Sequence, residues 1–208
     1  MCEILKKDGL SLKLLHRLTY HSALGISLKK NLHYFDKETL FKELLNVIQW
    51  YDTNPALHNL TIDYRIKSPQ SAFFKYHRYY PDHQARKVFN DLLGFRTLVD
   101  SYKEILLLDK NAELKIVDLS LGKAKDDGYR GVHVYYQEDN NSYPIEIQYN
   151  TYFDRQCNDW LHKYVYKRNY PDFVGSNLRS MYEQRKIVTE DEFEEVLQNV
   201  LHNSQENG

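Results

Sequence analysis

The sequence has 208 residues, of which 28 are Lys or Arg and 29 are Asp or Glu, so its formal net charge is −1. This balance argues against a general nucleic-acid coat protein and against a DNA partner, although it permits a local basic patch. Hydrophobic residues make up 42% of the chain, which has 8 glycines and 5 prolines. These proportions predict an ordinary globular core in one domain with helical additions.

The two cysteines, Cys2 and Cys157, have neither the spacing of a metal site nor that of a disulfide framework. The first residues, MCEILKKDG, carry charge too early for a signal peptide, and no apolar run approaches the length of a membrane span. We therefore expect a protein of the reducing cytoplasm with no membrane partner.

The N-terminal quarter of the chain has helical patterns. Residues 4–35 are predicted to form an uneven helix, and Asp36 is predicted to cap the start of a second helix that ends at Asn54-Pro55. Lys29 and Lys30 form a basic pair that is either a solvated face or an anion contact. The predicted buried faces are Leu10, Leu14, Leu15 and Leu18, and then Leu40, Phe41, Leu44, Ile48 and Tyr51.

A strand pattern at 61–67 runs into a helix start at Ser68-Pro69. Ser71 and Lys75 lie four residues apart and share a face of this helix. With Arg65 and Lys67 they place three cations and a hydroxyl at a helix N-terminus, which favours anions through its free N–H groups. The pattern predicts a phosphate site, and plain surface charge is the alternative.

Residues 90–99 indicate a second strand, with Asp91 at its mouth and Arg96 within it. A helix over 101–108 and a strand over 114–119 are predicted next. Because strands and helices alternate, we expect an α/β sheet.

Residues 125–151 predict a glycine-bounded loop and then a two-stranded hairpin with its turn at 138–142. In the second strand Glu146 and Gln148 share one face, because successive side chains of a strand point to opposite sides. If Ile145 and Ile147 pack inward, the two polar groups line a surface; if they do not, a carboxylate lies in a core, which costs free energy. Either case favours a functional role for Glu146.

Three helices are predicted after the hairpin. They cover 151–167, 176–186 after the interruption at Pro171, and a last helix that begins with the capping box Thr189 to Glu192. The last helix has an apolar stripe that packs on its own domain or on a partner, made of Phe193, Val196, Leu197, Val200 and Leu201.

Five short motifs occur in a fixed order between Asp63 and Lys167: R-x-K-S-x-x-S-x-x-x-K, D-x-x-G-x-R, K-x-x-G-Y-R-G-x-H, E-I-Q and H-K-x-x-Y-K. Together they resemble the synthetase domain of the RelA/SpoT family, and in particular its single-domain small alarmone synthetases. The resemblance implies an α/β (α+β) fold in which a mixed five-stranded sheet, related to nucleotidyltransferases, is flanked by helices. It also implies one domain, with N-terminal helices over 1–60, a catalytic core over 61–167 and a helical extension over 168–208.

The resemblance further implies transfer of pyrophosphate from ATP to a ribose 3′-hydroxyl. Asp91 would bind Mg²⁺ with Glu146 close by, and Glu146 is our candidate for the general base or a second metal ligand. Tyr129 would stack on the acceptor base. The ATP-binding residues would be Arg65, Lys67, Ser71, Lys75, Arg96 and Lys125; Gln148 would join the catalytic residues, and Arg130, His133 and Asn150 would complete the acceptor pocket.

The sequence departs from the family pattern after the E-I-Q motif. Tyr149 and Asn150 stand where the family usually has an aliphatic residue and Arg, and Cys157 and Leu161 replace a Trp and a Glu. Because the ATP-side motifs are intact, we expect ATP as donor and an altered acceptor. The 3′-CCA end of deacylated tRNA, as in toxic members of the family, is the first hypothesis.

A tRNA acceptor would need cations along its backbone, and a toxin would need a neutralising antitoxin. The alternatives are a synthetase that makes (p)ppGpp from GDP or GTP, a catalytically silent nucleotide sensor, and an interaction scaffold built on the last helix. The candidate tRNA contacts are Lys29, Lys30, Arg130, Lys163, Lys167 and Arg168.

Overall fold

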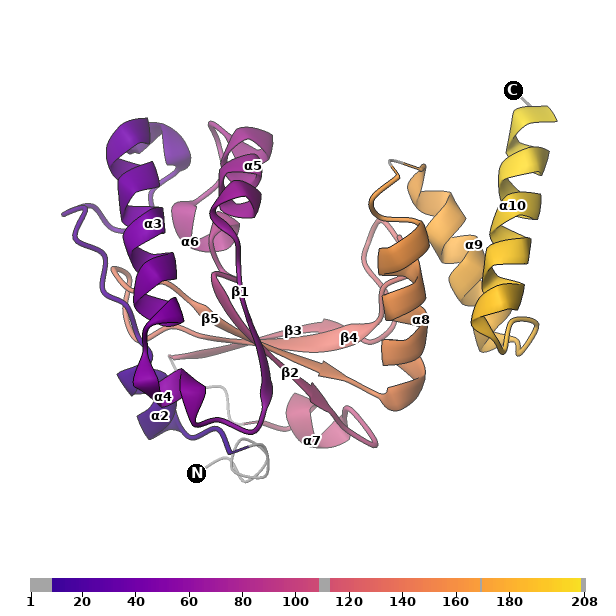
Figure 1. Cartoon of the computed structure of the whole chain (residues 1–208), viewed down its shortest axis with the longest axis horizontal. Helices are drawn as coiled ribbons and strands as arrows, with labels where there is room; N and C mark the ends of the chain where they lie inside the picture. The colour runs from indigo at the N-terminus through magenta and orange to yellow at the C-terminus, as the bar shows by residue number, and fades with distance from the viewer. Residues whose placement is uncertain (1–8, 109–112, 169, 207–208) are drawn as a thin grey trace. The chain divides into compact units, whose positions relative to one another are not determined.

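The computed structural model describes residues 9–108, 113–168 and 170–206, with side chains to residue 202. Its central element is a five-stranded sheet in the order β1-β2-β5-β4-β3 (Figure 1). This confirms the predicted mixed sheet flanked by helices. The strands are β1 (Asp63–Ile66), β2 (Leu93–Leu98), β3 (Leu114–Leu119), β4 (Gly131–Tyr136) and β5 (Ile145–Asn150).

The contacts between residues divide the chain into two compact units. The first unit consists of Met1–Thr97, Lys103–Val117 and His133–Gln148, and the second of Leu98–Tyr102, Asp118–Val132 and Tyr149–Gly208. Each unit combines segments that are distant in sequence, whereas the predicted division at residues 60 and 167 uses consecutive segments. The predicted boundaries at residues 60 and 167 stay a prediction.

The prediction of an uneven helix over 4–35 is wrong for the described part of that segment, and residues 4–8 lie outside the described residues. The structure has α2 (Leu12–Arg17) and a 3-10 turn, η1 (Leu32–Tyr34), with irregular chain between them. There the Ser22 and Leu28 amides donate to Asn141 and Asn140 in the hairpin turn, at 2.7 and 2.9 Å. These long-range bonds replace the helical ones, while Leu10, Leu15 and Leu18 are buried as predicted and Leu14 is half-buried.

The next two helices begin where their caps predict. In α3 (Lys37–Asp52) the Asp36 side chain accepts from the Thr39 amide, and in α5 (Pro69–Tyr79) the Ser68 side chain accepts from the Ser71 amide. The rings of Phe41 and Phe73 stack at 4.2 Å, and α3 and α5 lie side by side in Figure 1. The first unit also contains α4 (Pro55–His58), α6 (Ala85–Val88), which leads into β2, and α7 (Lys103–Leu106).

The second unit holds the three C-terminal helices α8 (Tyr152–Tyr164), α9 (Asp172–Glu183) and α10 (Glu190–Glu206). The helix predicted over 176–186 starts earlier, because Pro171 is its N-cap. The capping box of α10 is confirmed, since Thr189 Oγ1 accepts from the Glu192 amide at 3.3 Å and Glu192 Oε2 accepts from the Thr189 amide at 3.0 Å. The three helices share an apolar cluster that includes Trp160, Leu178, Tyr182, Phe193 and Leu197.

No helix within the described ranges is both long enough and apolar enough to cross a membrane.

A close backbone approach joins α9 to the loop before β4. Gly128 has a φ of +90°, and a Cβ there would lie 2.3 Å from the carbonyl oxygen of Gly175. A Cβ on Gly175 would lie 2.1 Å from the carbonyl oxygen of Asp127. Backbone atoms cannot rotate away as a flexible side chain can, so both positions require glycine.

This approach predicts that Gly175→Ala destabilises the protein by about 1–3 kcal/mol, because the added methyl group forces the backbone of α9 away from the loop. Ser176→Ala is the matched control, since that hydroxyl donates within its own helix to the Phe173 carbonyl. Urea unfolding of both variants measures the difference. Equal stability of the two would show that the close approach is not required.

Candidate functional site

The first part of the site is the N-terminus of α5 and the carboxylate in front of β2. Lys67 Nζ lies 2.7 Å from Asp91 Oδ2, and Lys75 Nζ lies 3.0 Å from Asp91 Oδ1. The Lys67 amide also donates to the Leu92 carbonyl at 2.9 Å, which fixes the end of β1 beside the start of β2. Ser71 Oγ accepts from the Ser68 hydroxyl at 2.9 Å in the first turn of α5.

The structure thus brings Lys67, Lys75 and Asp91 together, and Ser71 lies one turn before Lys75 on α5. Each oxygen of Asp91 accepts from one lysine, so the three groups together keep one net positive charge. A polyphosphate that arrives with a cation can take over both lysines and leave the carboxylate to the cation. The arrangement is therefore suited to a phosphate chain at a helix N-terminus.

Two arginines lie beside this cluster on neighbouring strands. In the antiparallel pair of β1 and β2, Arg65 faces Gly94 and Asp63 faces Arg96. Arg96 lies two residues after Gly94, so both guanidinium groups are on one face of the sheet. They line a small cavity of about 40 Å³ together with Lys67, Asp91, Gly94, Glu146 and Gln148.

Glu146 is the buried group of this cavity, with 6% of its surface exposed. Its neighbours Ile145 and Ile147 are fully buried, so both faces of β5 are covered here. Glu146 Oε1 lies 2.9 Å from His133 Nδ1 and accepts from the Tyr135 hydroxyl at 2.9 Å. Glu146 Oε2 accepts from Gln148 Nε2 at 2.7 Å.

These contacts decide the ionisation of the carboxyl. Burial by itself acts to raise the pKa of Glu146, but the hydrogen bond and charge of His133, with the hydrogen bonds of Tyr135 and Gln148, hold that pKa below its ordinary value. Glu146 is therefore a carboxylate at neutral pH. Gly94 of β2 faces this carboxylate, and a Cβ at that position would lie 3.5 Å from Glu146 Oε2, an ordinary van der Waals contact.

The carboxylates fit a magnesium ion better than a metal held by protein alone. Among the residues that the structure describes, no group of three or more His, Cys, Asp or Glu could hold a metal ion. Mg²⁺ is commonly bound by one or two carboxylates together with substrate phosphates and water. Asp91 and Glu146 line one cavity with cations that suit phosphate, so the donor set meets this requirement.

The predicted acceptor residues Tyr129, Arg130 and Asn150 belong to the second unit, on and beside the loop before β4. Arg130 is 8% exposed and its guanidinium donates to Asp126 at 2.8 and 3.0 Å. Asn150 is also buried, and its amide donates to the Arg130 carbonyl at 2.9 Å. Arg130 and Asn150 thus shape the loop that carries Tyr129, and their contact with an acceptor stays a prediction.

Arg179 and Asn158 also hold this loop, although the sequence did not point to them. Arg179 is fully buried in α9 and donates to the Gly128 carbonyl at 2.6 Å and to Asn158 Oδ1 at 2.6 Å. Asn158 Nδ2 donates to the Arg130 carbonyl at 2.7 Å. A charged residue among the apolar positions of a helix was the available signal, but its partners become visible only when the chain is folded.

The remaining predicted cations belong to both units. Lys125 is exposed and pairs with Asp172 at 2.6 Å, and Lys163 pairs with Glu190 at 2.8 Å. Lys29 and Lys30 are exposed in the first unit, and Lys167 and Arg168 are exposed in the second. Their predicted roles with ATP or tRNA stay predictions.

Comparison with known proteins gives one family match. A family model described as "Region found in RelA / SpoT proteins" matches residues 64–170, about half of the chain. No curated protein matches the chain.

Several solved structures are also similar. Small alarmone synthetase 1 from Bacillus subtilis, bound to its product pppGpp, has 18% sequence identity and a TM-score of 0.41 over 80% of this chain and 89% of that one. For small alarmone synthetase 2 from the same organism the values are 19%, 0.43, 83% and 100%. For a GTP pyrophosphokinase family protein from Streptococcus pneumoniae they are 21%, 0.40, 82% and 90%.

The hydrogen bonds of Glu146 predict a pH-dependent contribution to folding. Because its pKa is below the ordinary 4.5 in the folded protein, the stabilisation is present above that value and is lost as the pH falls through the folded pKa. The difference in unfolding free energy between wild type and Glu146→Gln should therefore shrink from about pH 6 to about pH 3. Urea unfolding across this range measures it, and Glu194→Gln, an exposed change on α10, should show no such trend.

Proposed function

We propose that this chain, which belongs to the RelA/SpoT family, is a pyrophosphokinase. Its donor is ATP, and its acceptor is the 3′-CCA end of deacylated tRNA. The observation that carries the catalytic part is the single cavity that Asp91, Glu146, Lys67 and two arginines line. In the reaction the terminal ribose 3′-oxygen attacks the β-phosphorus of ATP. The bond from that phosphorus to the α-phosphate oxygen breaks, and AMP leaves.

The residues of the first unit supply position and charge for this in-line transfer. Lys67, Lys75 and the N-terminus of α5 hold the phosphate chain, and the planes of Arg65 and Arg96 take the adenine. Mg²⁺ at Asp91, with Glu146 close by, would neutralise further phosphate charge. Lys75 is held by Asp91 until phosphate arrives, so the same ion pair keeps both groups in place beforehand.

Glu146 takes the proton of the attacking hydroxyl. A carboxylate with a lowered pKa is a weak base, so it accepts the proton late, when the oxygen already bonds to phosphorus. The main role of Glu146 is therefore to orient the hydroxyl rather than to remove its proton. Gln148 and Tyr135 fix the carboxylate for that purpose through bonds of 2.7 and 2.9 Å.

The choice of tRNA rests on the departures after the E-I-Q motif and on the exposed pair Lys29 and Lys30. Cys157 and Leu161 are fully buried in the apolar cluster of α8 to α10, and burial raises the pKa of the Cys157 thiol to about 11. These two departures therefore act through packing of the helix, whereas Asn150 acts on the acceptor loop itself. A tRNA-modifying enzyme of this kind would block translation in the cytoplasm and would require an antitoxin protein.

A guanine nucleotide is the second acceptor to test, because Tyr129 stacks on any base. We expect γ-labelled ATP with Mg²⁺ to label deacylated tRNA and to leave GDP and GTP unlabelled. Label on the guanine nucleotide alone would make the chain a synthetase of (p)ppGpp. Absence of label on both, with no AMP released, would make it a silent nucleotide sensor.

Tyr129→Ala should lower acceptor labelling at least about fivefold, because stacking of one base on an aromatic ring is worth ~1–3 kcal/mol. ATP affinity should not change, since the ATP-binding groups of the first unit are untouched. Tyr152→Ala, an exposed tyrosine of the same unit, is the matched control. Steady-state kinetics with ATP and acceptor varied in turn separate the two effects, and full activity of Tyr129→Ala would exclude the stacking role.

A further inference from the structure

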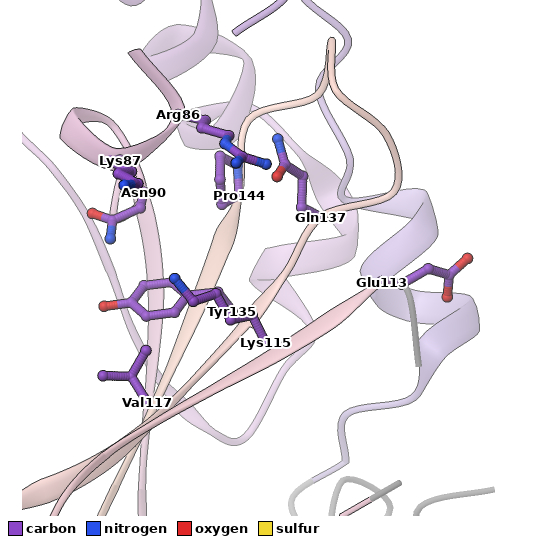
Figure 2. Close-up of a pocket in the computed structure, with 9 residues that line it drawn as sticks. All are labelled: Arg86, Lys87, Asn90, Glu113, Lys115, Val117, Tyr135, Gln137 and Pro144. Atoms are coloured by element: carbon purple, nitrogen blue, oxygen red, sulfur yellow. The ribbon is translucent and has the colours of Figure 1, made fainter. Parts of the chain in front are cut away.

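A second, larger cavity of the first unit has no role in the transfer described above. Its volume is about 520 Å³, and its lining residues come from α6 and the segment after it, from β3, and from both ends of the hairpin turn. Figure 2 shows Arg86, Gln137 and Pro144 on one side and Tyr135 with Lys115 on the other. The other lining residues are Lys87, Asn90, Glu113 and Val117.

The cavity adjoins the catalytic carboxylate through one residue. The Tyr135 ring lines the cavity, and its hydroxyl donates to Glu146 Oε1 at 2.9 Å. The small cavity of the ATP-binding residues includes Glu146 as well, so Glu146 and Tyr135 lie between the two cavities. A substrate whose reacting hydroxyl lies at Glu146 can therefore extend past Tyr135 into the larger cavity.

The lining is suited to an anion with a flat ring. Arg86, Lys87 and Lys115 bring three positive charges, whereas the one acidic residue, Glu113, points away from the group in Figure 2. Asn90 and Gln137 add amide groups that can hydrogen-bond a base edge, and the Tyr135 ring can stack on a base. The volume is in the range of small-molecule sites, about 300–1,000 Å³, and so suits a nucleotide better than a bare phosphate ion.

A basic pair outside the cavity, Lys29 and Lys30, lies beside two of its lining residues. The Arg86 amide donates to the Leu28 carbonyl at 2.9 Å, and the Ala85 amide donates to the Lys30 carbonyl at 3.0 Å. These bonds hold the exposed residues Lys29 and Lys30 beside the segment that carries Arg86 and Lys87. The cations therefore continue from the cavity onto the surface, as a strand of several phosphates requires.

The position of Lys115 on an edge strand is enough to explain its charge. β3 is an edge strand, and an exposed lysine such as Lys115 keeps an edge from pairing with another chain. This reason does not apply to Arg86 and Lys87, which belong to α6. Cations from two separate segments around one cavity point to a ligand.

We infer that this cavity binds the nucleotide that precedes the reacting one in an RNA acceptor, with its phosphodiester at Arg86, Lys87 and Lys115. The inference rests on the proposed function, because it takes the acceptor to be an RNA 3′-end. The cavity is then the site that distinguishes a polynucleotide from a free nucleotide. A single nucleotide that reacts at Glu146 leaves its base-binding part empty.

A chain-length series tests this role. Wild type and Arg86→Glu/Lys115→Glu would be offered AMP, CpA and CpCpA as acceptors with γ-labelled ATP. In wild type, the acceptor KM should fall at least about fivefold from AMP to CpA, as one added stacked base is expected to give. In the variant this gain should disappear while the KM for ATP stays the same; a variant that keeps the gain would overturn the inference.

Binding without turnover gives an independent readout. The affinity for a 5′-fluorescent RNA that ends in CCA would be measured by anisotropy at several salt concentrations, with Lys13→Glu/Lys42→Glu as a control of equal charge at exposed positions of α2 and α3. The cavity variant should bind more weakly and lose about 0.7 of the salt slope for each phosphate contact removed. The milder Arg86→Gln/Lys115→Gln variant should lie between it and wild type.

The two hypotheses fail in different ways. Labelling of GDP or GTP and not of tRNA by the wild-type enzyme would overturn the proposed acceptor, and it requires no variant. Equal RNA affinity of the cavity variant and its charge control would overturn the role of the cavity, and it requires no ATP.

Discussion

The burial of one carboxylate determines how the catalytic part of this protein is built. Glu146 lies in a strand with both faces covered, where an unpaired carboxylate would be costly. His133, Tyr135 and Gln148 supply its hydrogen bonds, and all of them lie on the same hairpin. The hairpin register must therefore be exact to one residue, because a slip would move every one of these groups to the opposite face.

The second charged group is balanced in a different way. Asp91 is half-buried at the start of β2 and is neutralised by two lysines, one from the end of β1 and one from α5. The partners of Asp91 are ammonium groups at the ends of long side chains, whereas those of Glu146 are neighbouring side chains of the same hairpin. One carboxylate is thus balanced by two separate charges, and the other is held by three hydrogen-bonding neighbours.

The loop of the second unit is fixed through its backbone. Arg179 and Asn158 bind the carbonyl groups of Gly128 and Arg130, and Gly175 lets the helix approach the same loop. Tyr129, on the same loop, is half-buried, and Lys123 Nζ lies 5.4 Å from the centroid of its ring. Helix α9 lies after the segment that the family model matches, so the position of Tyr129 depends on residues outside it.

The sequence by itself determined the strands and the helix caps, because these depend on local patterns. All five strands were predicted, those at 61–67 and in the hairpin from period-two alternation, and Asp36, Ser68 and the Thr189 box predicted three helix starts. Only the tertiary structure decided the irregular path of residues 18–31, where bonds to the hairpin turn outweigh helical propensity. It also decided that Arg179 holds a loop some fifty residues earlier in the chain and that Arg86 and Lys115 line one cavity. Such contacts join residues far apart in sequence, and no local pattern encodes them.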